Sequence, residues 1–345
     1  MNYIKSPSCS KYIISLLIIL ISVFSCSKPE PFLLQGRTMG TSYSIKISDR
    51  LKTGETAADV QKEIDELLKK INFQMSTYIP ESEISRFNKM QSSKPFKVSK
   101  DFINVFSLSL DIFKESGGAF DVTIGPLVNL WGFGKNGTRS EPPAAAEIQK
   151  MLNTVGTNHL KILDDSMISK AIPSIELDFG AIAKGYGVDA VGGLLLAKDY
   201  KNFMVEIGGE VLVKGLKAGQ KWKIGIDRPA AGAVPGENLQ AVINITDMAA
   251  ATSGDYRNYF LHEDSLYSHE IDPRSGRPIQ NGTASVSVLA PSCIEADAMA
   301  TAIIVMGAEK GLKWVESKPG IEAMIIVHDG KNFKEIVSSG FKKFL

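Results

Sequence analysis

Cysteine is scarce in this chain of 345 residues, which carries three, and net charge is almost absent at +1. Cys9 and Cys26 lie near the start, so Cys293 stands alone in the region that we expect to fold. One cysteine cannot form an intramolecular disulfide, and we expect Cys293 to be a small buried apolar residue. A net charge this small excludes an overall electrostatic field that would attract nucleic acid. Local charged groups must therefore hold any anionic ligand.

Motifs of several common enzyme classes are missing as well. No cluster of cysteines and histidines suits zinc, and no Gly-x-Ser-x-Gly elbow suggests an α/β-hydrolase. Glycine-rich segments at Gly132–Gly137 and Gly180–Gly187 have the spacing of nucleotide-binding loops. The first leads into prolines, and the second has Tyr186 where a P-loop needs lysine and places its later glycines inside an expected helix. We reject these segments as standard nucleotide sites.

The longest hydrophobic run, Tyr12 to Phe24, is too short to span a bilayer comfortably. It follows two lysines and ends in Val23-Phe24-Ser25-Cys26, which resembles a bacterial lipobox. The pattern predicts a signal peptide over residues 1–25, lipidation of Cys26, and a proline-containing tether over 26–35. An uncleaved anchor helix is the alternative. A lipoprotein signal predicts an extracytoplasmic protein, anchored to a bacterial membrane and facing the periplasm.

The periodicity of the remaining sequence predicts an α+β fold. Apolar residues alternate over Thr41–Ile47, as in a strand, and follow helical spacing over Thr56–Phe73. Ser99 is an expected N-cap of a second helix. Further expected elements are a loop at Gly117–Gly137, helices at Ala144–Val155, Ala181–Ala197, around Asp297 and near Trp314, short strands near Leu160, Ser166 and Ile175, strands at Phe203–Ile207, Val211–Lys214, Trp222–Ile226, Leu239–Thr246 and Ala284–Leu289, and a hairpin at Glu322–Ile336. Strands in meanders with inserted helices, and no linker after the tether, predict one domain.

Asp297 and Thr301 are the most informative pair in the sequence. They lie four residues apart in an alanine-rich segment that we expect to be a buried helix, so they share one face. A carboxylate and a hydroxyl on one rigid face suit Mg²⁺, which takes few protein ligands and leaves other positions to water and phosphate. The alternative is that nearby backbone satisfies both side chains.

Other segments place charged side chains beside glycines. Asp178 and Lys184 flank a tight turn after an expected apolar strand, where they could contact a ribose and a phosphate. A salt bridge at the start of a helix is the alternative interpretation. Phe120 and Asp121 lie on a glycine-containing loop that could approach a ligand closely. Segments 250–257 and 267–274 add hydroxyls, His269 and arginines.

These segments together resemble the ApbE family of FAD:protein FMN transferases. The resemblance begins at about Gly36 and continues in collinear order to the C-terminus. It rests on Met39-Gly40-Thr41, Ser76-Thr77-Tyr78, Ser82-Glu83, Phe87-Asn88, Gly118 to Pro126, Asp178 to Lys184, Val205 to Glu210, Ala251 to Tyr256, His269 to Gly276 and Ala296 to Thr301. It implies a single T-fold-like domain over 36–345, with a mainly antiparallel sheet and packing helices. It also implies binding of FAD and Mg²⁺ in a cleft.

The resemblance assigns roles by position. The residues that it implies as FAD contacts are Met39, Tyr78, Ala119, Phe120, Asp121, Asp178, Lys184 and Ile271. The implied metal ligands are Asp297, Thr301 and the backbone carbonyl of Ala181. His269 is our candidate for the general base, because an unperturbed imidazole titrates near neutrality. Its alternative role is to orient the loop that contains Asp272.

The implied reaction transfers FMN to a protein. A threonine or serine hydroxyl of an acceptor attacks the FMN-side phosphorus of FAD and AMP is released, with Mg²⁺ neutralising pyrophosphate charge. The expected acceptors resemble the flavin-carrying subunits of Na⁺-pumping NADH:quinone oxidoreductase or Rnf complexes. The alternatives are an FAD pyrophosphatase, against which the aromatic Tyr78 argues, and a non-catalytic flavin-binding lipoprotein, against which the Asp297–Thr301 pair argues.

Overall fold

The computed structural model describes Met1 and residues 32–345, apart from 136, 231, 233, 235, 257, 264 and 331. The expected signal peptide, the expected lipidation site at Cys26 and most of the tether therefore lie outside the described residues. From Pro31 to Leu345 the chain is one compact unit. None of the helices in the described part is long and apolar enough to cross a membrane.

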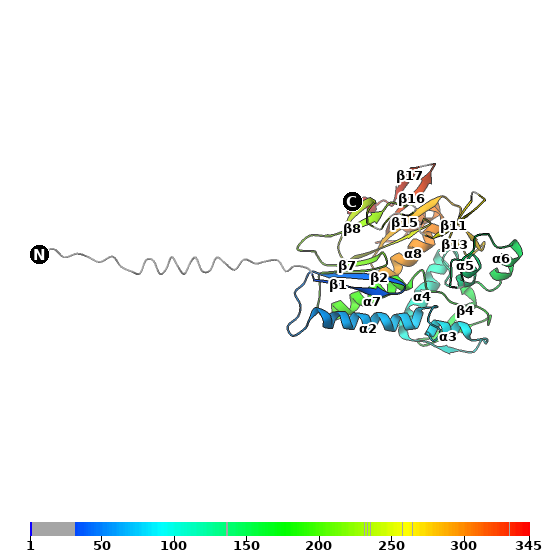
Figure 1. Cartoon of the computed structure of the whole chain (residues 1–345), viewed down its shortest axis with the longest axis horizontal. Coiled ribbons are helices and arrows are strands. Elements are labelled where there is room, and N and C mark those ends of the chain that lie inside the picture. Colours follow the sequence, from blue (N-terminus) through cyan, green and yellow to red (C-terminus); the bar gives the residue numbers. More distant parts are fainter. Residues whose placement is uncertain are drawn as a thin grey trace. The chain divides into compact units, whose positions relative to one another are not determined.

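An eight-stranded antiparallel sheet lies at the centre of this unit (Figure 1). Its strands in spatial order are β1 (Phe32–Thr38), β2 (Thr41–Ile47), β6 (Phe203–Ile207), β7 (Glu210–Lys214), β10 (Met248–Gly254), β15 (Thr283–Ala290), β16 (Glu322–Asp329) and β17 (Asn332–Val337). Every residue of β15 is buried, because both faces of the sheet are covered.

Helices cover one face of the sheet. They are α2 (Ala57–Met75), α7 (Ala183–Ala197), α8 (Cys293–Met306) and α9 (Ala308–Glu316), with α4 (Lys100–Glu115) packed against α8. Figure 1 shows α2 and α7 beneath β1 and β2. The hairpin of β8 (Trp222–Asp227) and β9 (Leu239–Ile245) packs with the 3-10 helix Phe341–Phe344 against the other face. Trp222 and Phe341 are buried there, which places a second hydrophobic core on that side.

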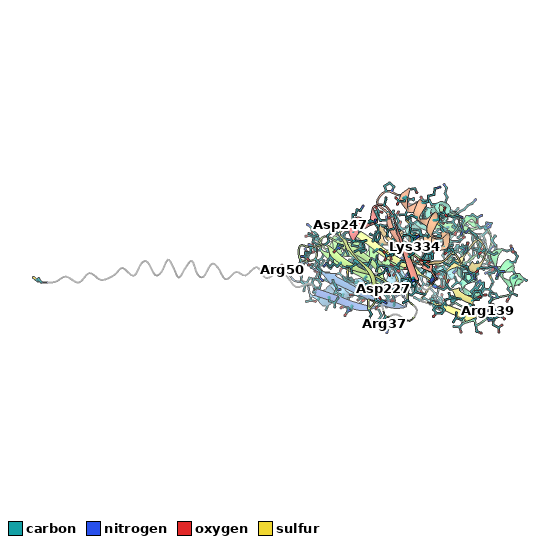
Figure 2. The ribbon with its side chains drawn as sticks, turned by 90° about the horizontal axis from the view of Figure 1, so that it is seen from above. Arg37, Arg50, Arg139, Asp227, Asp247 and Lys334 are labelled. Carbon is teal, nitrogen blue, oxygen red and sulfur yellow. The ribbon has the colours of Figure 1, made fainter. Side chains whose placement is uncertain are left out.

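The remaining elements are smaller and lie outside the central sheet and its covering helices. They are α3 (Glu83–Lys89), α5 (Gly125–Leu130), α6 (Ala145–Leu152), the 3-10 helix Thr157–His159, a sheet of β3 (Phe96–Lys97), β5 (Met167–Lys170) and β4 (Leu160–Asp164), and the hairpins β11 (Tyr259–His262)–β12 (Ser265–Ser268) and β13 (Ile271–Asp272)–β14 (Arg277–Pro278). Arg139, labelled in Figure 2, joins two of these elements. Its guanidinium donates to the carbonyl of Leu130 at 3.0 Å and lies 3.8 Å from the carboxylate of Glu147 in α6.

The predicted α+β class is confirmed, and the strands at Thr41–Ile47 and Phe203–Ile207 have the predicted bounds. Ser99 caps α4 as expected, accepting a hydrogen bond from the N–H of Phe102. Thr56 caps α2 through a capping box with Asp59. Cys293 is buried, also as expected.

Three expectations about local structure were wrong. The expected loop Gly117–Gly137 contains the short helix α5. The segment near Ile175 is not a strand. The central strand β10 was missed because its run Ala249-Ala250-Ala251 has no strand propensity. Ala249 and Ala251 are buried on the face of β10 against which α8 packs, where the close approach requires small side chains, and Ala250 is buried on the opposite face.

Candidate active site

A cavity of about 380 Å³ lies where α7, α8, β7 and β10 meet the loops around Phe120 and Ile271. It gathers side chains that are far apart in the sequence. Ten of the residues singled out above line it: Ala119, Phe120, Asp121, Asp178, Ala181, Lys184, His269, Ile271, Asp297 and Thr301. The structure therefore brings both parts of the implied site, the flavin contacts and the metal ligands, to one place.

Met39 and Tyr78 line a second hollow of about 550 Å³. Asp178, Gly180 and Lys184 line both hollows, so the two adjoin along the segment between Asp178 and α7. An elongated ligand could therefore extend from one hollow to the other.

Asp297 lies on α8 and is only 4% exposed. Its Oδ2 accepts a hydrogen bond of 2.9 Å from the backbone N–H of Gly185 on α7. Its Oδ1 lies 3.8 Å from the ammonium of Lys184. One turn further along α8, the hydroxyl of Thr301 lies 3.1 Å from the hydroxyl of Ser253 on β10. The expected sharing of one helix face is confirmed, because both residues line the cavity.

The start of α8 is fixed by a residue of another helix. Ser292 occupies the N-cap position but makes no side-chain cap bond. Asp189 on α7 accepts 2.9 Å hydrogen bonds from the N–H groups of Cys293 and Ile294 instead. Burial raises the pKa of Asp189 to about 6, although both N–H groups act in the opposite direction. This contact fixes the position of α7 relative to α8, and with it the position of Lys184 relative to Asp297.

Lys184 lies between two carboxylates. Its Nζ is 3.0 Å from Oε1 of Glu210 and 3.8 Å from Oδ1 of Asp297. Burial alone would lower the pKa of this ammonium, but the charges of Asp297 and Glu210 outweigh that effect and raise it. Lys184 therefore stays protonated, and its positive charge faces the cavity.

Glu210 is the site residue whose role the sequence did not reveal. It begins β7, is 4% exposed and lines the cavity. Its Oε2 has no hydrogen-bond partner among the described residues, and burial raises the pKa of this carboxyl well above its usual range. The segment Gly208-Gly209-Glu210 was noted in the sequence, but only the fold brings its carboxylate to Lys184.

Asp178 follows an extended segment that is held by side chains and not by a neighbouring strand. The amide of Asn88 donates to the carbonyl of Leu177 at 2.8 Å and accepts from its N–H at 2.7 Å. The N–H of Asp178 donates to the carbonyl of Val122 at 2.7 Å. Buried Lys170 donates to the carbonyl of Ile175 at 3.0 Å. These bonds fix the backbone that carries Asp178, whose pKa is raised by burial.

Asp121 is buried within a hydrogen-bond network of its own. Its Oδ1 accepts from the N–H and hydroxyl of Thr123 and from the hydroxyl of Thr157, at 2.6 to 2.8 Å. Its Oδ2 accepts from the N–H of Thr157 at 3.1 Å. The carboxylate thus orders the loop that presents Ala119 and Phe120 to the cavity.

His269 lies immediately after β12 at the rim of the cavity. Its backbone N–H donates to the carbonyl of Asn258 at 3.0 Å, and its Nδ1 lies 3.2 Å from the same oxygen. Because a carbonyl only accepts, Nδ1 must carry the proton, which leaves Nε2 of a neutral ring able to accept one. Nε2 is 3.7 Å from the carboxylate of buried Glu270, which would stabilise an imidazolium. This geometry suits a general base.

Met39 and Tyr78 lie at the mouth of the second hollow. Met39 and Gly40 form the two-residue turn between β1 and β2, and both have positive φ, 48° and 75°. Such a turn matches the twist of a hairpin, although Met39 is strained in it. Tyr78 is 71% exposed, so its ring is free to cover a ligand.

The donor set in the cavity fits Mg²⁺. Asp297 offers an anionic oxygen and Thr301 a neutral one, and Ala181, whose carbonyl is the third implied ligand, lines the same cavity. In the described part of the chain, no group of three or more His, Cys, Asp or Glu residues could hold a metal ion. That excludes a zinc-like cluster there but not a Mg²⁺ site, because Mg²⁺ keeps positions for water and phosphate.

The glycines that resemble a nucleotide fingerprint serve helix packing. Gly185 is the third residue of α7, in its first turn and not deep inside the helix as expected. Its N–H is nevertheless taken by Asp297, so it is not available to a phosphate. A Cβ on Gly187 would lie 2.9 Å from the side chain of Met39. The rejection of this segment as a standard nucleotide loop therefore agrees with its contacts.

Comparison with known proteins gives a consistent result. The family model described as "ApbE family" matches residues 39–325. A protein of Vibrio cholerae named FAD:protein FMN transferase is 44% identical over 328 residues, covering 94% of this chain and 96% of that protein. The protein of that name from Escherichia coli K12 is 35% identical over 326 residues, covering 92% and 90%.

Solved structures agree with this match. The flavin transferase ApbE from Vibrio cholerae superposes with a TM-score of 0.83 at 43% identity, covering 92% of this chain and 99% of that one. The apo form of the flavinyl transferase ApbE from Pseudomonas stutzeri gives 0.82 at 34% identity, covering 91% and 96%. On this evidence the chain belongs to the ApbE family.

Proposed function

We propose that this chain is a Mg²⁺-dependent FAD:protein FMN transferase. The observation that carries the proposal is the convergence of a hydroxyl-and-carboxylate pair, an ammonium and a histidine on one cavity: Asp297 and Thr301, Lys184, and His269. A storage protein needs no general base beside its ligand. The family relatives named above carry the same activity in their names.

FAD would lie across the two adjoining hollows. Phe120, Ile271 and Ala119 offer apolar surface to its rings, and Asp178 offers an acceptor at the boundary of the hollows. Lys184 would pair with the pyrophosphate, because its ammonium stays charged and faces the cavity. Tyr78 and Met39 would cover the open end.

Mg²⁺ would be held by Asp297, Thr301 and the carbonyl of Ala181. When bound, it supplies charge neutralisation at the pyrophosphate and helps to align it for displacement. Gly185 keeps one oxygen of Asp297 in place through its N–H, so the carboxylate is oriented before any ion arrives.

His269 would take the proton from the acceptor hydroxyl at Nε2. The oxygen of a threonine or serine then forms a bond to the FMN-side phosphorus, and the bond from that phosphorus to the oxygen of AMP breaks. AMP leaves with the electron pair, and the product is an FMN phosphoester on the acceptor. The carbonyl of Asn258 keeps Nε2 free for this step by holding the proton on Nδ1.

The test is incubation of the protein with FAD, Mg²⁺ and a purified acceptor domain, followed by intact mass measurement. We propose the flavin-carrying subunits of Na⁺-pumping NADH:quinone oxidoreductase or Rnf complexes as acceptors. We expect a protein adduct with the mass of a phosphoester-linked FMN, together with AMP. Fast release of free FMN and AMP without an adduct would instead make the protein a pyrophosphatase.

We further propose that the chain acts outside the cytoplasm on a lipid anchor at Cys26. The lipobox-like Val23-Phe24-Ser25-Cys26 supports this proposal. Expression with a labelled fatty acid tests it. Label on the wild type and none on Cys26→Ala is the expected result, whereas label on both variants would contradict lipidation at Cys26.

A further inference from the structure

Lys184 and Asp297 form an ion pair at the place where the proposed function puts a divalent cation. The ammonium of Lys184 lies 3.8 Å from Oδ1 of Asp297. The other oxygen of this carboxylate, Oδ2, accepts from the N–H of Gly185 at 2.9 Å. Oδ1 is therefore the oxygen that faces a cation, and the cation that it faces in this structure is the lysine.

One carboxylate oxygen in this cavity does not suit two cations at once. Mg²⁺ binds oxygen at about 2.1 Å, so an ion on Oδ1 would lie within about 6 Å of an ammonium that stays 3.8 Å from the same atom. Both cations are positive, and Asp297 is only 4% exposed, so little water screens their repulsion. Binding of the metal ion therefore favours departure of the ammonium from Asp297.

Lys184 is the group that can move. Asp297 is held on α8 by the N–H of Gly185. Glu210 begins β7 and pairs with Ile207 of β6, so strand register fixes its backbone. Lys184 is the second residue of α7 and carries its charge on a flexible four-carbon stem. A change of partner therefore needs only a rotation of the lysine side chain.

The displaced ammonium has a second partner inside the cavity. Oε1 of Glu210 lies 3.0 Å from Nζ of Lys184. The turn between β6 and β7 lies beside the stem of the lysine, because a Cβ on Gly208 would lie 3.4 Å from its Cδ. When it leaves Asp297, the ammonium can therefore stay next to Glu210, facing the place where the phosphates of FAD would lie.

We propose that Lys184 is an exchangeable counter-ion of Asp297. It occupies the cation position at Oδ1 before a divalent cation binds, and that cation displaces it toward Glu210. The proposal rests on the proposed function only in taking Asp297 as a metal ligand. FAD draws the ammonium away from Asp297 by offering it a phosphate, so FAD strengthens metal binding and the metal strengthens FAD binding by the same factor.

A fixed structural ion pair would behave differently. Loss of its lysine would leave the buried carboxylate of Asp297 unpaired, and the affinities for metal and for FAD would both fall as the site loosens. In an exchangeable pair the two affinities change in opposite directions. Removal of the ammonium removes a competitor of the metal ion and, at the same time, a partner of the phosphate.

The test measures binding and not turnover, on the full-length protein. Lys184→Met keeps most of the apolar stem and removes the charge. Calorimetry measures the affinity for Mg²⁺ without FAD, and flavin fluorescence measures the affinity for FAD in the presence of a chelator. We expect affinity for Mg²⁺ to rise about tenfold or more, the effect of a single charge close to a carboxylate. Affinity for FAD should fall about tenfold or more through loss of a charged phosphate contact.

Two controls locate the effect. Lys198 also lies between two carboxylates, at 2.5 Å from Glu55 and 2.8 Å from Glu63, but outside the cavity. Lys198→Met should therefore match the wild type in both affinities. Adding Asp297→Asn to Lys184→Met should abolish the gain in affinity for Mg²⁺. A gain that persists would place the new binding elsewhere and overturn the proposal.

The remaining outcomes are equally definite. If Lys184→Met does not fold, as judged by circular dichroism, Lys184→Met/Glu210→Gln is compared with Glu210→Gln, and the same gain of about tenfold is expected. Unchanged or weaker binding of Mg²⁺ on loss of the lysine, or no measurable binding in either protein, overturns the proposal. Transfer of FMN by the wild type would in that case leave the proposed function intact. The expected gain without any transfer by the wild type would support the exchange and reject the proposed function.

Discussion

Gly185 on α7 and Asp297 on α8 are in direct contact through backbone and side chain. The N–H of Gly185 donates to Oδ2 of Asp297 at 2.9 Å. A Cβ on Gly185 would lie 2.8 Å from Cβ of Asp297 and 2.5 Å from the carbonyl oxygen of Cys293. The two helices can approach this closely only because residue 185 has no side chain.

Gly185→Ala should therefore separate the helices. The added methyl group meets backbone, which cannot move aside cheaply, so we expect a loss of about 1–3 kcal/mol in the free energy of unfolding. Asp297 would also shift relative to Lys184, and transfer activity should fall at least about tenfold, the loss typical of small misplacements of reacting groups. Urea denaturation and the adduct assay measure the two effects.

Gly193→Ala is the control within the same helix. A Cβ there meets nothing within 4 Å. Because alanine is the better helix former, this variant should be unchanged or more stable by about 0.5–1 kcal/mol. Equal destabilisation of both variants would show that the contact with Asp297 is not the cause.

Asp297→Asn isolates the charge of the metal ligand. Asparagine retains an oxygen that can accept from the N–H of Gly185, whereas alanine would leave that donor unpaired. We expect affinity for Mg²⁺, measured from the dependence of turnover on its concentration, to fall by at least about 100-fold. FAD affinity should fall only moderately, and the fold should persist. Thr301→Ala removes a neutral donor and should have a milder effect of the same kind. Wild-type Mg²⁺ dependence in Asp297→Asn would show that α8 does not hold the ion.

His269→Ala removes the proposed base. Transfer should fall by about 100-fold to about 10,000-fold, the usual contribution of general base catalysis, while FAD affinity stays near that of the wild type. His159→Ala, on a half-buried histidine outside the cavity, is the control and should retain activity. Retained transfer in His269→Ala would assign this residue to positioning of the neighbouring loop instead.

Asn88→Ala tests the support of Asp178. The substitution leaves both the N–H and the carbonyl of Leu177 without their side-chain partner, so the free energy of unfolding should fall by about 1–3 kcal/mol. If the segment must be fixed to present Asp178, FAD affinity should fall as well. Stability and FAD titrations measure the two quantities separately. A stability loss with unchanged FAD affinity would limit Asn88 to a structural role.

The raised pKa of Asp189 predicts a pH dependence of stability. Its carboxyl has a pKa of about 6 in the folded protein, against an ordinary value near 3.8. The folded state therefore binds the proton more tightly, and the contribution of this group is fully present below about pH 4 and is lost as pH rises through 6. The loss is about 3 kcal/mol at most. Asp189→Asn should abolish this part of the slope between pH 4 and 6. Parallel stability curves for the two proteins would contradict the assignment.

The elements with strong local signals could be predicted from the sequence. The capping residue Ser99 and the alternation over Thr41–Ile47 are such signals, because they arise from interactions within a few residues. The strand β10 could not be predicted in this way. Its alanines have no local preference for a strand, and the small size of Ala251 allows close packing of helix α8, which lies about fifty residues further along the chain.

The same distinction between local and long-range interactions applies to the candidate site. The sequence by itself determined that Asp297 and Thr301 share a face, because a helix fixes the direction of residues four apart. Only the tertiary structure decided that Gly185 would hold Asp297, that Glu210 would pair with Lys184, and that the carbonyl of Asn258 would fix the tautomer of His269. The first two contacts join different elements and the third joins the two ends of a hairpin, so they depend on packing and strand register that no local pattern specifies.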